Sequence, residues 1–118
     1  MNDSILLHVG EVVCGSEEEI QAFKSDLLMY INSALMTLNQ LGVGEENFIV
    51  TGENETWADF IGDESKYGAI RDCVTMKVKL AFDPPASSSA LDSLERLIEQ
   101  AEFRLSIQAD PASYKEVT

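Results

Sequence analysis

The sequence has 118 residues, a length typical of one domain whose apolar core needs no metal or disulfide for support. It carries 21 acidic and 8 basic residues, a formal charge of −13, which disfavours direct binding to nucleic-acid phosphates and to anionic membranes. The 45% hydrophobic content argues against disorder, yet no apolar run approaches the roughly 20 residues of a membrane span. With no recognisable export signal, we expect the protein to be soluble and cytoplasmic when made.

The first half of the chain predicts two helices. Apolar residues recur at spacings of three and four over residues 5–13, and Gly15 is suited to end this short helix. Residues 16–19 form a Ser-x-x-Glu capping box that begins a longer helix, whose apolar stripe runs to Leu41. The stripe contains Ile20, Phe23, Leu27, Ile31, Leu35, Leu38 and Leu41, and is widened by Leu28, Met29, Ala34 and Met36. Residues 42–44, Gly-Val-Gly, predict a left-handed helix cap, since a phosphate cradle would need a preceding strand and a following helix.

The middle of the chain predicts a loop followed by a short helix. The one strand-like run in residues 45–55 is too short to build a sheet. Thr56 is a candidate N-cap, with Asp59 at the capping-box position. Trp57, the only tryptophan, has two interpretations: a binding hot spot, or a staple that holds the loop on the bundle. The staple is the commoner role.

The last third of the chain predicts two more helices. One covers residues 65–82 and ends at Asp83-Pro84-Pro85, because proline has no N–H and disfavours helical geometry in the residue before it. The serines at 87–89 are candidate N-caps for a final helix that Asp110-Pro111 closes. The apolar positions of this helix are Leu91, Leu94, Ile98, Ala101 and Leu105.

These elements predict an all-α fold, a small helical bundle of three long helices with short helices at the N-terminus and near Trp57. We expect residues 1–109 to form a single helical domain. Residues 110–118 show no periodicity and are expected to be a flexible C-terminal tail.

No catalytic, cofactor-binding or metal-binding pattern is present in the sequence. His8, the only histidine, has no cysteine or carboxylate at ligand spacing, and no calcium loop or nucleophile motif exists. Cys14 and Cys73 lie far apart and predict free, buried thiols in a reducing compartment. We therefore expect a protein that is not an enzyme and that holds no cofactor or metal.

Four carboxylates follow one another at spacings of three, four and three along one side of the last helix. They are Asp92, Glu95, Glu99 and Glu102. This acidic stripe is either a solvated face or the wall of a ring through which DNA passes, where negative charge would keep the duplex from sticking.

Residues 26–44 and 77–95 together resemble the head-to-tail connector (adaptor) family of long-tailed bacteriophages. In that family a helix with an apolar face ends at an Asp-Pro-Pro turn, a serine-rich cap follows, and a last helix runs almost to the C-terminus. The resemblance spans residues 5–108. Its structural matches are Asp83, Pro84 and Pro85 for the interhelix turn, Trp57 for the short-helix tryptophan, and Phe103, Arg104 and Leu105 for a late aromatic-Arg-Leu segment.

The resemblance implies a structural protein of the virion neck that assembles in the host cytoplasm. Such adaptors form a homo-oligomeric ring, usually of twelve subunits, beneath the portal protein, although the isolated chain can be a monomer. The ring extends the DNA channel without binding DNA specifically, and it joins the capsid to the next neck or tail-completion protein.

Two groups of residues become candidate contacts in such a ring. The basic residues on or just before the third long helix are candidates for the subunit interface: Lys66, Arg71, Lys77 and Lys79. The C-terminal tail, including Tyr114 and Lys115, is expected to order against the portal.

A protein of another class fits the charge equally well. It is a small acidic regulator or inhibitor that binds a basic nucleic-acid-binding protein by mimicking phosphate charge.

Overall fold

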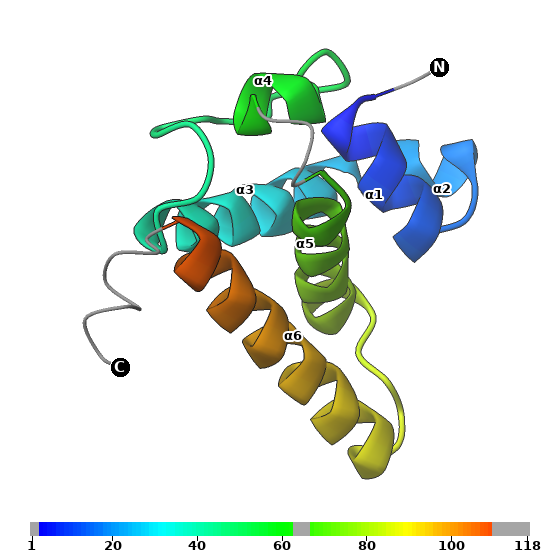
Figure 1. The fold of residues 1–118 in the computed structure, drawn as a ribbon. Coiled ribbons are helices and arrows are strands. Elements are labelled where there is room, and N and C mark those ends of the chain that lie inside the picture. The colour runs from blue at the N-terminus through cyan, green and yellow to red at the C-terminus, as the bar shows by residue number, and fades with distance from the viewer. Residues whose placement is uncertain (1–2, 63–66, 110–118) are drawn as a thin grey trace.

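The computed structural model describes residues 3–62 and 67–109, and within these ranges the chain is all-α (Figure 1). The helices are α1 (Ile5–Val13), α2 (Glu17–Ala22), α3 (Lys24–Gln40), α4 (Trp57–Ile61), α5 (Tyr67–Phe82) and α6 (Ser88–Ala109). The predicted bundle of three long helices, with short helices at the N-terminus and near Trp57, is confirmed. The β pairing in the described ranges is a single isolated bridge between Ser4 and Thr56.

Side-chain caps begin the helices where the sequence predicts them. The Thr56 hydroxyl accepts the Asp59 N–H at 3.2 Å, and the Asp59 carboxylate accepts the Thr56 N–H at 3.1 Å, so this capping box is complete. Ser16 accepts the Glu19 N–H at 3.2 Å, but its hydroxyl, and not its backbone amide, donates to the Glu19 carboxylate. Ser87 caps α6 by accepting an N–H of the first turn at 3.1 Å.

The predicted helix from Ser16 to Leu41 is wrong in one respect, because a break at Phe23 divides it into α2 and α3. Ile20 packs so closely on Gly10 that a Cβ at Gly10 would lie 2.8 Å from it, which draws α2 toward α1. The Phe23 ring turns instead toward Phe82 of α5, with ring centroids 5.3 Å apart in an edge-to-face contact. These tertiary contacts favour a bend over a straight helix.

The core lies where α3, α5 and α1 meet, and α5 also packs against α6 (Figure 1). Its members come from every helix and from the loop after α3: Ile5, Leu6, Val9, Ile20, Leu27, Ile31, Ala34, Leu35, Leu38, Val43, Val50, Trp57, Phe60, Ile70, Cys73, Val74, Val78 and Leu105. On α6 only Ile98 and Leu105 are buried. Most of the surface of α6 is therefore available for contacts with other proteins.

The predicted stop signals after α3 and α5 end their helices. After α3, the Val43 N–H donates to the Leu38 carbonyl and the Gly42 N–H to the Asn39 carbonyl, each at 2.9 Å, with Gly42 at φ +86°. This pair of bonds is a Schellman cap, which satisfies carbonyls that the helix end would leave free. α5 ends at Phe82, directly before Asp83-Pro84-Pro85.

Candidate interaction surfaces

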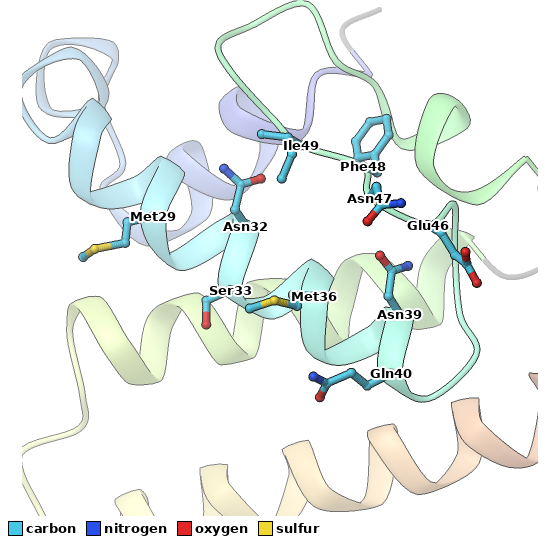
Figure 2. Close-up of a pocket in the computed structure, with 10 residues that line it drawn as sticks. All are labelled: Met29, Asn32, Ser33, Met36, Asn39, Gln40, Glu46, Asn47, Phe48 and Ile49. Atoms are coloured by element: carbon cyan, nitrogen blue, oxygen red, sulfur yellow. The ribbon is translucent and has the colours of Figure 1, made fainter.

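An apolar groove of about 580 Å³ lies between α3 and the loop of residues 45–55, and we call it the α3 groove (Figure 2). Met29 and Met36 line it from α3, and Ile49 lines it from the loop. These three residues expose 58%, 59% and 57% of their surface. Ten described residues line the groove, and Glu46 alone among them is charged.

Side-chain amides of α3 hold the loop that forms the opposite wall of the groove. The Asn32 amide donates to the Val50 carbonyl at 2.9 Å and accepts the Val50 N–H at 2.8 Å. Asn39 donates to the Val43 carbonyl at 2.8 Å. Because Val50 is buried, its backbone polar groups need partners, and the Asn32 bonds anchor the loop to α3. The Asn39 bond holds the turn that precedes the loop.

The sequence interpretation missed this groove, since it assigned Met29 and Met36 to a widened inward stripe. At about 100° per residue, both methionines lie roughly 160–180° around α3 from Leu38, which is buried. On a helical wheel of α3, Met29 and Met36 therefore form a second apolar stripe, separate from the buried one, and this stripe is the sequence signal for the groove.

Two large apolar side chains of α6 are exposed, Phe103 and Leu97. Phe103 exposes 62% of its surface, whereas Leu105, two residues later, is buried. Arg104 between them is exposed. Leu97 is also exposed and borders a crevice between α5 and α6 that Met76 lines from the other side.

The predicted acidic stripe contains two environments. Asp92, Glu95 and Glu99 are exposed on α6. Glu102 is half-buried and forms an ion pair with Lys77 of α5, with Nζ and Oε2 2.7 Å apart. One member of the predicted channel-facing set thus contacts one member of the predicted interface set within the same subunit.

The other candidate interface cations also differ in their surroundings. The Lys79 ammonium lies 3.5 Å from the Asp83 carboxylate, in an exposed pair four residues apart. Arg71 is half-buried, and its Nε has no hydrogen-bond partner. Lys66 lies outside the described residues, as do Tyr114 and Lys115 of the predicted portal-binding tail. In the described part of the chain, Lys77 and Lys79 of the predicted interface set thus form ion pairs within their own subunit.

Trp57 is fully buried, a position that suits a staple and offers no surface to a partner. Its backbone N–H donates to the Asp3 carbonyl at 3.1 Å, which ties α4 to the N-terminal segment. The His8 ring meets its indole edge-to-face, with centroids 5.8 Å apart. The indole N–H has no hydrogen-bond partner, so the side chain stabilises the fold through packing.

Burial of His8, together with the nearby Arg71 guanidinium, lowers the pKa of this histidine from its ordinary value of 6.5. The unfolded chain therefore binds a proton more readily than the folded chain, and stability is lost as the pH falls from 6.5 through the lower folded pKa. We expect thermal unfolding at pH 7.5 and 5.5 to show a larger loss of Tm for the wild type than for a His8→Phe variant. Parallel pH dependence of the two proteins would rule out this role of His8.

Reactive groups do not converge in the described part of the chain. No group of three or more His, Cys, Asp or Glu residues in residues 3–62 and 67–109 is placed to hold a metal ion. Burial raises the pKa of the Cys73 thiol to about 11, and it also raises the pKa of Cys14; both thiols are free. Of the helices described, none combines the length and apolar character needed to cross a bilayer.

Comparison with known proteins identifies one family. The family model described as phage connector protein matches residues 5–112, a segment that contains all six described helices. No curated protein and no solved structure is significantly similar to the chain.

Proposed function

Because this chain belongs to the phage connector protein family, we propose that it is a structural subunit of the phage head–tail junction. In this proposal twelve copies form a ring beneath the portal protein, extend the DNA channel, and join the capsid to the next neck or tail-completion protein. Its place in the virion is the neck. The observation that carries the proposal is the family match from α1 through α6.

The surface of the subunit supports an assembly role. Exposed apolar residues lie at two separate places, in the α3 groove and at Phe103 on the outer face of α6. The α3 groove is a contiguous apolar surface, and such surfaces on a small protein commonly mark contact sites for other proteins. A ring needs two such sites, because each subunit presents one face to its predecessor and a different face to its successor.

A phage with a nonsense mutation in this gene tests the proposal. Electron microscopy of the mutant lysate should show tails that accumulate unattached beside capsids that have leaked or lost their DNA. The gene supplied on a plasmid should restore tailed particles. Intact tailed particles in the uncomplemented lysate would contradict the proposal.

We propose that the exposed part of the acidic stripe faces the channel. Replacing both Glu95 and Glu99 with lysine should leave the fold intact, because both side chains are exposed, while DNA delivery per particle falls by about tenfold or more. The matched control reverses Glu17 and Glu18, exposed residues of the first turn of α2. Normal DNA delivery by the variant with lysine at Glu95 and Glu99 would show that the acidic stripe is only a solvated face of α6.

Two further contacts belong to the proposal. Residues 110–118, including Tyr114 and Lys115, would bind the portal, so a chain ending at Ala109 should lose portal binding in a pull-down without a lower Tm. Because Lys77 and Lys79 have partners within the subunit, contacts of the four predicted interface cations with a neighbour would depend chiefly on Lys66 and Arg71.

A further inference from the structure

We propose that the α3 groove is the docking site for a second copy of this chain, and that Phe103 of that copy enters it. The inference rests on the proposed function, since a ring requires a donor face and a different acceptor face on every subunit. It assigns the acceptor face to α3 with the loop of residues 45–55, and the donor face to α6.

Charge is the first argument for a second copy as the occupant. Each copy carries a formal charge of −13, so two copies repel each other wherever their acidic surfaces meet. Charged residues make up 25% of the chain, but Glu46 alone is charged among the ten described residues that line the groove. Depletion of charge, with methionine and aromatic residues in its place, is the composition of an interface core. The groove is thus a surface on which one anionic copy can approach another at close range.

The position of Phe103 on α6 is the second argument. It lies about 160° around the helix from Leu105, which is buried, so its ring points away from its own bundle. The large apolar side chains that are exposed in the described ranges include two aromatic ones, Phe23 and Phe103. The Phe23 ring already packs on Phe82. Among the described side chains, Phe103 is therefore the exposed phenylalanine that is free to enter another subunit.

The chemistry of the groove matches an aromatic ring carried on a helix. Figure 2 shows Met36 on the α3 side of the groove, with Asn39 and Asn47 pointing toward one another from α3 and the loop. Flexible methionine side chains adapt to an aromatic ring and contact it favourably, and the amides can bond polar groups at the rim.

One charge beside Phe103 complements the rim of the groove. Arg96 lies about 20° from Phe103 around α6, two turns earlier, and Glu46 at the rim is a carboxylate that it can approach. Asp92 and Glu99, both exposed, lie about 20° and 40° to the other side of Phe103. The donor face therefore carries one arginine and two carboxylates, and Arg96 is the residue that can offset the repulsion between two anionic copies at this rim.

Cysteine cross-linking in assembled particles tests the docking. A Cys14→Ser chain that carries both Met36→Cys and Phe103→Cys is supplied to the nonsense-mutant phage, and purified particles are oxidised and run on a non-reducing gel. Because a disulfide requires Cβ atoms about 3.5–4.5 Å apart, docking should produce a ladder of dimers and higher multimers that reductant abolishes. A chain with only one of the two added cysteines cannot form a ladder, because the remaining native thiol, Cys73, is fully buried. A chain that pairs Met36→Cys with Val12→Cys, on α1, should form none.

A second pair, Ile49→Cys with Phe103→Cys, uses the opposite wall of the groove and replaces residues that are both exposed, so folding is preserved. Tailed particles that contain the chain but give no ladder with either pair would overturn the docking and leave the proposed function intact. Cross-links from the groove to a different neck protein would also overturn it. Particles that join tails without containing the chain would instead overturn the proposed function.

Discussion

Replacing Trp57 with alanine is expected to lower the free energy of unfolding by about 3–5 kcal/mol, as the loss of a large buried aromatic side chain usually does. The residue is fully buried and belongs to the same core cluster as residues of α1, α3 and α5. Since domains of this size are stable by only about 5–15 kcal/mol, such a loss would leave little reserve. Chemical denaturation followed by circular dichroism measures the change.

A Trp57→Phe variant separates packing from hydrogen bonding. The indole N–H has no partner, so phenylalanine sacrifices no hydrogen bond and should cost about 1–2 kcal/mol. If Trp57→Phe destabilised the protein as much as Trp57→Ala, the indole N–H would have to form a hydrogen bond that is absent from the structure. A small effect of alanine would contradict the role of Trp57 as a staple.

Replacing Gly44 with alanine is expected to cost about 3 kcal/mol, for two reasons that act together. The backbone at Gly44 has φ +81°, which strains any residue with a Cβ. A Cβ there would also overlap the Phe60 ring, which is almost fully buried and packs against Phe48 with centroids 5.4 Å apart. The ring has little room to move, and Phe48 belongs to the wall of the α3 groove.

Gly15 supplies the matched control for Gly44. Its φ of +92° imposes comparable backbone strain, but nothing lies within 4 Å of the position that a Cβ would take. Gly15→Ala should therefore cost only about 1 kcal/mol, and the difference between the two variants measures the overlap with Phe60. Similar midpoints of denaturation for both variants would show that the Phe60 ring can give way.

Local signals in the sequence predict much of this fold. The Thr56–Asp59 capping box, the glycine cap after α3 and the Asp83-Pro84-Pro85 stop each depend on groups within a few residues of one another. Backbone geometry at such sites follows from proline and glycine chemistry and from short hydrogen bonds, whatever lies elsewhere in the chain.

The features that sequence reasoning missed depend on contacts between distant segments. At the bend, the Phe23 ring contacts Phe82, which is remote in sequence, and the periodicity of α2 and α3 contains no sign of this contact. The Lys77–Glu102 ion pair joins α5 to α6. Spacing along the last helix predicts that Glu102 belongs to the exposed stripe, but it does not identify this partner on another helix.

The candidate surfaces were predictable to different degrees. Charge spacing identified Glu95 and Glu99 as exposed neighbours on the last helix, and the structure places them so. The α3 groove was harder, because its second wall is a loop whose position depends on the Asn32–Val50 bonds. An apolar residue count also assigns Met36 to the core, whereas its position around the helix places it on the opposite side.

Cryo-electron microscopy of the neck of the phage that encodes this chain would show whether its copies form the proposed ring. We expect a ring of density between the portal and the tail into which the bundle of α3, α5 and α6 fits, with Glu95 and Glu99 toward the channel and Phe103 of each subunit in the α3 groove of its neighbour. A neck whose density is fully explained by other proteins, with this chain absent from the particle, would contradict this expectation. The acidic surface would then fit better with a small regulator that binds a basic partner.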